Sequence, residues 1–473
     1  MTASLTMVET AVNAFNGSRD ELKTNNAYYD STHRPQAIGM ATPVEMQKLL
    51  ASIGWCRVYL DSIEERLNLQ GFRLAGAGKA DDKLWKWWQA NKLDEFAGLG
   101  HREALKHGRA YVAISVPDKN DPLADKTCPI IRVFSPAEMY AEIDRRNDRV
   151  KWAIRVIDSS TGETNEIGQQ LPNVVTLYMP MFTAVYERGV NGWVETERVD
   201  HKLGIVPVVP LLNRTNLNDV HGTSEISNEL RDVTDVASRT MMNMAATMEL
   251  MAIPQRLLFG VDRDELMKQS GGSTYQAYIA RILAFTDENA QAQQFQAAEL
   301  RNFTEVMQEL TKQAATYTGL PPQYLSFSSD NPASAEAIRS SESRLVTKCE
   351  RKATIFGSAW EQVMRIAMLV MGETLPEGAY RMESIWGDPA TPTFAAQADA
   401  VTKLVSTTSG DGRALVPVEM GRIKLGFSVE ERRQMDVWDK EAPKSQLAGL
   451  LAPPAAPQFQ APRAPTPTGV SNG

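Results

Sequence analysis

Few residues in this sequence combine the types and spacing that chemistry requires, and a glycine-rich stretch comes nearest. Gly76-Ala77-Gly78-Lys79 matches the glycine–lysine end of a phosphate-binding P-loop. That loop also needs a glycine five residues before its second glycine and a Ser or Thr after the lysine, because these residues form the phosphate cradle. The sequence has Arg73 and Ala80 at those positions. We therefore interpret the stretch as a flexible loop and predict no nucleotide site there.

The residues that most often bind metals or catalyse reactions are scattered along the chain. No histidine belongs to an H-E-x-x-H pair, and no serine lies in a G-x-S-x-G elbow. Asp118 to Pro122 has some calcium-loop character, but the glycine of that loop is missing and its alternation breaks at Pro122. We predict no catalytic residue, no metal site and no cofactor. The histidines are His33, His101, His107, His201 and His221.

A tryptophan cluster, Trp85-Lys86-Trp87-Trp88, has two interpretations. It could stack nucleic-acid bases. It could instead belong to an amphipathic helix that buries Leu84 and Trp88 against a sheet while Trp85 packs on a second surface. We favour the helix, because acids offset the nearby lysines and leave no net basic patch. These charges are Lys83, Lys86, Lys92, Asp81, Asp82, Asp94 and Glu95.

Composition predicts a soluble chain of several lobes. Its 473 residues correspond to about three domains, and 43% are hydrophobic. The cysteines Cys56, Cys128 and Cys349 lie far apart, which indicates a reducing compartment and neither a disulfide framework nor a zinc site. We expect no signal peptide, because residues 2–16 form a mixed amphipathic stretch without a basic start. The most apolar run, Leu203 to Leu212, contains two prolines and is too short for a membrane span of about 20 residues.

The net charge of −8 has the wrong sign for tight binding to DNA, because phosphate contacts dominate such affinity. It is compatible with a surface past which DNA slides, since a neutral or acidic wall repels phosphates and prevents sticking.

The first half of the chain has the pattern of helices followed by an antiparallel meander, an α+β lobe. Helices are predicted over 4–17, Pro43–Asn68 with Thr42 as N-cap, and Asp81–Ala90. Strands are predicted over Arg109–Val116, Pro129–Phe134, Lys151–Asp158, Asn173–Met179, Thr183–Arg188 and Gly192–Arg198.

The second half is mainly helical. A helix over 224–251 carries an apolar stripe ending in Met241, Met244, Met248 and Met251, which could be an adaptable binding face but which we expect to pack on another helix. An insert over 253–296 holds strands at Gln255–Phe259 and Tyr278–Phe285 around a short helix at Arg263–Lys268. Further helices are predicted over Ala297–Tyr317, Ser334–Met371, Thr393–Ser406, Pro417–Leu425 and Val429–Trp438, before a Pro-rich tail from Ala452 that we expect to be disordered.

The order of these elements, with several local sequences, resembles the portal or head-to-tail connector proteins of long-tailed bacteriophages, especially actinobacterial phages. The likeness covers roughly residues 5–440. The segments that carry it are Leu105–Val112, Leu203–Pro210, Gly222–Ile226, Thr318–Leu325 and Asn331–Ile338.

The resemblance implies an elongated α+β subunit with named parts. They are a wing (1–223), a first stem helix (224–251), a small α/β clip (252–297), a second stem helix (298–320), a tunnel loop region (321–333), a long tunnel helix that returns to the wing (334–388), a helical crown (389–451) and a disordered tail (452–473).

The resemblance also implies a ring, typically of twelve copies, at one capsid vertex of the virion, assembled in the host cytoplasm. Double-stranded DNA would pass through it without sequence specificity. The clip would dock terminase and head-completion proteins, and the wing would face the capsid and scaffolding proteins. No membrane partner is implied.

The residues expected to meet DNA in the channel are Ser326, Ser328, Ser329, Asp330 and Asn331 of the tunnel loop. Arg339, Arg344 and Lys348 on the following helix could touch phosphates or contact another subunit. Ion pairs are their favoured use, because Glu336, Glu342 and Glu350 lie close along that helix. Two other hypotheses remain open: another phage structural protein such as a minor head protein, and an enzyme of DNA metabolism.

Overall fold

A computed structural model describes most of the chain, which divides into two compact units, Met1–Thr391 and Pro392–Gly473. Both helices and sheets build the first unit, so the α+β prediction is confirmed. The described residues are 2–33, 52–77, 80–118, 122, 125–158, 172–190, 192–251, 256–259, 282–285, 300–326, 335–390, 394–408, 414–427 and 431–440.

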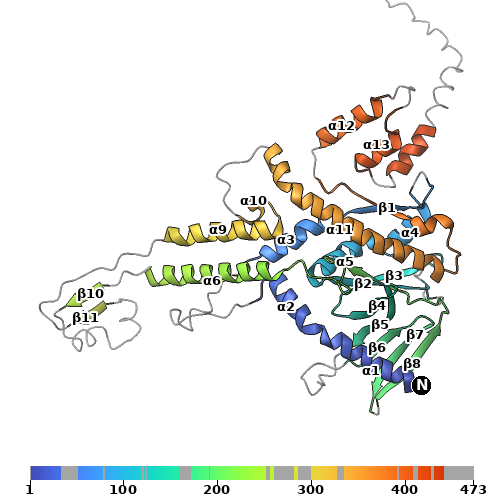
Figure 1. Cartoon of the computed structure of the whole chain (residues 1–473), viewed down its shortest axis with the longest axis horizontal. Coiled ribbons are helices and arrows are strands. Elements are labelled where there is room, and N and C mark those ends of the chain that lie inside the picture. The colour runs from blue at the N-terminus through green and yellow to red at the C-terminus, as the bar shows by residue number, and fades with distance from the viewer. Residues whose placement is uncertain are drawn as a thin grey trace, which may run out of the picture. The chain divides into compact units, whose positions relative to one another are not determined.

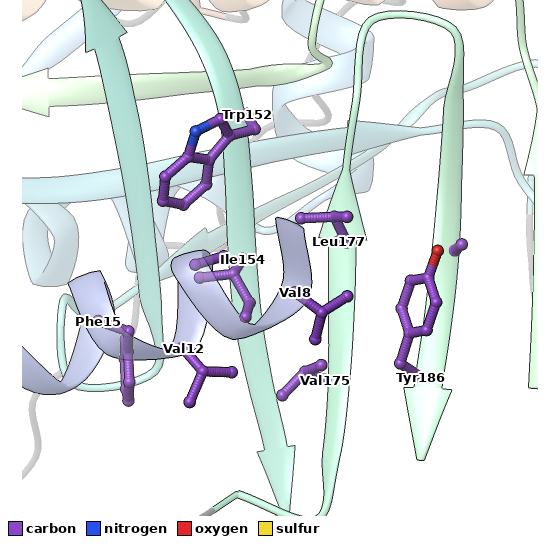
Figure 2. Packing of buried hydrophobic residues seen from close by; sticks show 10 residues of the cluster. Val8, Val12, Phe15, Trp152, Ile154, Val175, Leu177 and Tyr186 are labelled. Atoms are coloured by element: carbon purple, nitrogen blue, oxygen red, sulfur yellow. The ribbon is translucent and has the colours of Figure 1, made fainter. Parts of the chain in front are cut away.

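The predicted meander is present only in part. The predicted strands Arg109–Val116 and Pro129–Phe134 belong to a separate sheet. The last four predicted strands form a five-stranded antiparallel sheet, which keeps the name meander, together with Met139–Asp144, which was not predicted as a strand, and the spatial order of this sheet follows the chain. One face is covered by helix α1 (Thr2–Gly17), as Figure 2 shows: Val8, Val12 and Phe15 pack against Trp152 and Ile154. Alternate side chains of a strand point to opposite faces, so Ala153 joins a different core on the other side. The strands are β4 (Met139–Asp144), β5 (Arg149–Asp158), β6 (Val174–Tyr178), β7 (Phe182–Gly189) and β8 (Gly192–Asp200).

A second sheet, with strand order β3-β2-β9, packs on the face of the meander opposite α1. Tyr111 and Phe134 from this sheet share a core with Met139 and Ala153 of the meander. The apolar run that is too short for a membrane span supplies β9. Helix α5 (Leu93–His107) packs on β2 and β3, and α11 (Ala335–Val370) packs on β9. The strands are β2 (Arg109–Ser115), β3 (Ile130–Phe134) and β9 (Val208–Leu212).

The helix predicted over Pro43–Asn68 is wrong as one element. Residues 52–54 are not helical, and α3 runs only over Trp55–Glu64, with Gly54 as its N-cap. Glycine in a helix interior is unfavourable by about 1 kcal/mol, which explains the start at this point. The first part of the prediction, including Thr42, falls outside the described residues. Helix α2 (Arg19–Tyr29) follows α1 and was not predicted.

The tryptophan cluster lies on α4 (Asp82–Ala90), whose N-cap Asp81 accepts hydrogen bonds from the backbone N–H groups of Lys83 and Leu84. Trp87 and Trp88 are buried, which excludes a stacking platform for bases. Trp88 packs against a strand, as expected, but not against the meander. Its ring instead contacts Phe72, on strand β1 (Leu69–Arg73), and Trp360 of α11. Strand β1 pairs with β12 (Glu383–Trp386), which follows the 3-10 turn η2 (Glu377–Arg381).

Two long helices, α6 (Asn228–Met251) and α9 (Leu300–Thr318), pack side by side (Figure 1). Helix α6 begins four residues later than predicted, because the Ser224 and Ser227 hydroxyls accept hydrogen bonds from backbone N–H groups before and at its first turn. The predicted methionine stripe is also corrected. Met242 and Ala246 are buried, whereas Met248 is half exposed.

The insert between α6 and α9 contains the two predicted strands. Strands β10 (Arg256–Phe259) and β11 (Ile282–Phe285) pair in parallel. The predicted helix at Arg263–Lys268 lies outside the described residues.

Helix α11 (Ala335–Val370) has 36 residues, which corresponds to about 54 Å. Its second half is the most deeply buried part, through Phe356, Trp360 and Val363. A four-residue helix, α10 (Pro322–Leu325), precedes it.

The second unit contains α12 (Phe394–Ser406), α13 (Val418–Lys424) and a helix over 431–440. Arg422 joins α13 to that last helix through Asp436 and Asp439. These helices match the predicted ones within a few residues, and the Pro-rich tail lies outside the described residues.

Truncation of α1 at its core contact tests the role of this helix. We expect Phe15→Ala to lower the free energy of unfolding by about 3 kcal/mol, because it leaves a cavity between α1 and the meander. Limited proteolysis with mass spectrometry should then show faster cleavage around α1. Glu9→Ala, on the exposed side of the same helix, is the control and should behave as wild type. Equal cleavage rates in both variants would contradict the assignment.

Candidate functional site

Five polar side chains from separate parts of the chain meet where α11 passes the base of α6. We name Tyr59, Asn213, Glu225, Lys348 and Lys352 the central polar cluster. Lys352 Nζ lies 2.5 Å from Glu225 Oε1 and donates to Asn213 Oδ1. Lys348 Nζ lies 3.7 Å from Glu225 Oε2. Tyr59 Oη donates to that same oxygen at 2.6 Å and accepts from Lys348.

The cluster joins four elements of the fold. Tyr59 comes from α3, Asn213 follows β9, Glu225 precedes α6, and the two lysines lie one turn apart on α11. Lys348 also donates to the Thr318 carbonyl at the end of α9. The paired helices α6 and α9 are therefore both tied to α11 through one buried set of charges.

Backbone contacts fix the segment that carries Asn213 and Glu225. Gly108 and Gly222 both have φ near +80°, and a Cβ on Gly222 would lie 1.8 Å from the Gly108 carbonyl oxygen. Only glycine allows this approach. The N–H of Asn213 donates to Gly108, and that of Glu225 donates to Leu105. These contacts with the end of α5 fix the position of the segment that leads into α6.

The electrostatics of the cluster are those of a buried ion triad. Burial alone would raise the pKa of Glu225, but the charges of Lys352 and Lys348, with hydrogen bonds from Lys352 and Tyr59, lower it to about 2. Burial lowers the pKa of Lys348, against the opposing charge of Glu225. Burial, with the neighbouring Glu225 charge, raises the pKa of Tyr59, so its hydroxyl stays a donor. The triad therefore holds α6 and α11 in a fixed geometry.

A second contact ties the segment before α11 to α11 itself. Tyr324 of α10 donates to Glu342 at 2.6 Å, and Arg66 approaches that carboxylate at 3.4 Å. Arg66 also donates to the Tyr324 hydroxyl and to the Pro389 carbonyl. The chain is therefore anchored immediately before residues 327–334 and again on the first turns that follow them.

The residues predicted to line a channel are only partly described. Ser326 is the extended C-cap of α10, and Arg339 is exposed on α11. Arg344 is exposed and donates to the Thr316 carbonyl at 3.2 Å. Lys348 makes an ion pair with Glu225, which is far from it in the sequence, and not with an acid of its own helix. Ser328, Ser329, Asp330 and Asn331 fall outside the described residues.

Among the histidines, His101 has a structural role. His101 is fully buried, and burial lowers its pKa to about 3. It accepts a hydrogen bond from Trp360 Nε1 at 2.8 Å and stacks on Phe356. Across the described ranges, no group of three or more His, Cys, Asp and Glu side chains is placed to hold a metal ion. All three cysteines are buried and free.

Comparison with known proteins identifies the family of this chain. A family model described as phage portal protein, SPP1 Gp6-like, matches residues 11–416. The portal protein of Mycobacterium phage L5 is 50% identical over 466 residues, which cover 97% of this chain and 93% of the relative. The chain belongs to the phage portal protein family.

Further relatives in sequence and structure are similar. The portal protein of Mycobacterium phage D29 is 50% identical over 444 residues, covering 93% of this chain and 89% of the relative. Among solved structures, a chain from the neck of an empty GTA particle computed with C6 symmetry has a TM-score of 0.45 and 12% identity, covering 83% of this chain and 95% of that chain. Another, from the virion of a native gene transfer agent particle, has a TM-score of 0.43 and 12% identity, covering 85% of this chain and 99% of that chain.

Family membership confirms the resemblance drawn from the sequence. The two mycobacteriophage relatives are named as portal proteins, which are structural virion components. Within the parts of the chain that the model describes, no helix is long and apolar enough to cross a bilayer.

Removal of the central carboxylate tests the ion triad. We expect Glu225→Gln to destabilise the fold by about 3–5 kcal/mol, because it leaves two buried lysines without a counter-charge. Urea denaturation followed by tryptophan fluorescence measures the change. Glu350→Gln, an exposed carboxylate on α11, is the matched control and should shift stability by less than about 0.5 kcal/mol. A wild-type midpoint in Glu225→Gln would disprove the role of the triad.

The difference in stability between wild type and Glu225→Gln should depend on pH. The pKa of Glu225 is about 2 in the folded chain, against about 4.3 for an unperturbed glutamate. Its stabilising contribution is therefore complete above the unfolded value and is lost as the pH falls toward the folded one. The stability gap between wild type and Glu225→Gln should shrink between about pH 5 and about pH 2. A gap that widened on acidification would have the wrong sign for this ion triad.

Proposed function

We propose that copies of this chain form a ring at one capsid vertex of a tailed-phage particle, and that double-stranded DNA passes through its channel during packaging and ejection. The observation that carries the proposal is the family match across nearly the whole chain, together with a relative 50% identical over almost its full length. This match favours a portal over a minor head protein and over an enzyme of DNA metabolism. A ring, typically of twelve copies, is the assembly expected of the family.

In this proposal each predicted part is assigned to described elements. The three-stranded and five-stranded sheets with α1 to α5 form the wing, α6 and α9 the stem, β10 and β11 the clip, α11 the tunnel helix, and the second unit the crown. The side-by-side packing of α6 and α9 supports the stem assignment, and the parallel strand pair supports a small α/β clip. In the proposal the clip docks terminase and head-completion proteins, and the wing meets capsid and scaffolding proteins.

The tunnel loop, residues 326–333, would pass close to DNA. Its side chains are mostly small and polar with one acid, Asp330, and strong Lys or Arg pairing to phosphate would hinder sliding. The Arg66–Tyr324–Glu342 contact and the central polar cluster support this role, because they brace the chain on both sides of the loop. The net charge of −8 also fits transient rather than tight contact.

Electron microscopy of the purified full chain tests the ring. Negatively stained particles should show rings with a central hole, and mass measurement should give the copy number. A chain that stayed monomeric at every concentration, including with scaffolding and capsid proteins present, would refute the proposal.

Shortening the tunnel loop tests the DNA contact. We expect replacement of Ser328–Asn331 by two glycines to leave ring assembly intact but to reduce DNA packaging or retention, because the loop no longer reaches the duplex. Assembled particles carrying the variant would be scored for encapsidated DNA by nuclease protection. Packaging and retention equal to wild type in such particles would contradict the role given to the loop.

A further inference from the structure

A groove runs between α11 and the β4–β5 hairpin in the first unit. Two adjoining cavities of ≈ 640 and ≈ 120 Å³ share Val150 and Gln362 in their walls. Helix α11 contributes one wall with Ile355, Ala359 and Leu369, spaced so that they share a helix face. The opposite wall comes from the β4–β5 hairpin and from β9. We name this feature the α11 groove.

The α11 groove combines apolar walls with a positive mouth. Arg149, Lys151 and Arg365 line the larger cavity beside one acid, Asp144. Arg145 and Arg146 are exposed at the adjacent turn. Cations are therefore in excess at this place, although the chain as a whole has a net charge of −8. The groove therefore fits an occupant with apolar side chains beside acidic ones.

The chain carries a surface of that chemistry on the first turns of α5. Phe96 and Leu99 are 41% and 45% exposed, although both are large and apolar. Asp94 and Glu95 precede them and are exposed as well. We name these four residues the α5 knob. They stand on a helix whose other face is buried against the β3-β2-β9 sheet, so their backbone is rigidly held.

The groove and the knob lie at opposite edges of one sheet. In the order β3-β2-β9, the two outer strands are β3 and β9. Phe96 lines a cleft together with β3 residues 130–134, whereas β9 residues Val208, Pro210 and Leu212 line the α11 groove. Complementary surfaces at opposite edges of one subunit produce a head-to-tail contact, which closes into a ring when the rotation per copy is right.

We propose that the α5 knob of one copy seats in the α11 groove of the next copy around the ring. Phe96 and Leu99 occupy the apolar walls, and the acids of the knob face Arg149 and Lys151. The proposal rests on the proposed function only in requiring that copies assemble as a ring. It adds the residues of the contact, its head-to-tail direction and a role for the cations of the β4–β5 hairpin.

Site-directed cross-linking tests the contact. The native cysteines are buried, so Leu99→Cys and Gln362→Cys in one chain place new thiols on the knob and in the groove. A short bis-maleimide added to assembled rings should give a ladder of dimers, trimers and larger species, because each copy carries both halves. Either substitution alone should give no ladder. Val194→Cys with Gln362→Cys is the matched control, since Val194 is exposed on β8, outside the knob.

The possible results distinguish a failure of the proposed contact from a failure of ring formation. Wild-type rings without a Leu99–Gln362 ladder would overturn the contact and leave the groove for an acidic segment of another protein. Cross-linked dimers alone, without larger species, would also overturn it, because they indicate a symmetric pair. Absence of rings in wild type would instead reject the proposed function.

Truncation and blocking variants give an independent test that includes a check of folding. Phe96→Ala with Leu99→Ala removes the knob, and Ala359→Trp fills the groove. Each variant alone should shift from rings to monomers in sedimentation at matched concentration. An equimolar mixture should form dimers that stop growing, because one intact knob meets one intact groove. Dimers show that both variants are folded and support the proposal. Rings in either single variant, or no dimers in the mixture, would refute it.

Discussion

The described fold depends on one buried carboxylate held between two lysines. Glu225 lies before α6, while Lys348 and Lys352 belong to α11, so a charge interaction joins elements that hydrophobic packing alone would not align. Two charges taken out of water attract strongly only when their geometry is held and their remaining hydrogen bonds are satisfied. Tyr59 and Asn213 satisfy them. The arrangement therefore specifies one relative position of the helices more than it adds net stability.

Elements with a long, regular pattern could be predicted from the sequence. The α11 stripe and the alternating strands of the meander are examples, because their periodicity is local. Strands β1 and β12 have no such signal: each is short, and each becomes a strand by pairing with a partner some three hundred residues away. Strand β9 is an apolar run containing Pro210, which reads equally as a loop until its neighbour β2 is in place.

The candidate site was harder to predict than the fold. Lys348 was noted because it follows the loop, yet its partners Tyr59 and Glu225 are separated from it by 289 and more than a hundred residues. No local spacing encodes such a contact. Glu225 lies in a segment that resembles the family, and its position depends on the close approach of Gly108 and Gly222 and on backbone hydrogen bonds to the end of α5. The backbone geometry of this stretch thus determines where the Glu225 carboxylate lies.

The Gly108–Gly222 contact has a consequence for how the chain can vary. Most tight contacts tolerate a larger residue on one side if the other side shrinks, so pairs of substitutions can move through sequence space together. Here both partners already carry the smallest side chain, and the atom that would be struck is a backbone carbonyl. Neither position has a compensating neighbour. The two glycines form a mutational dead end, so library-based engineering of this scaffold should hold both fixed while diversifying the surfaces around them.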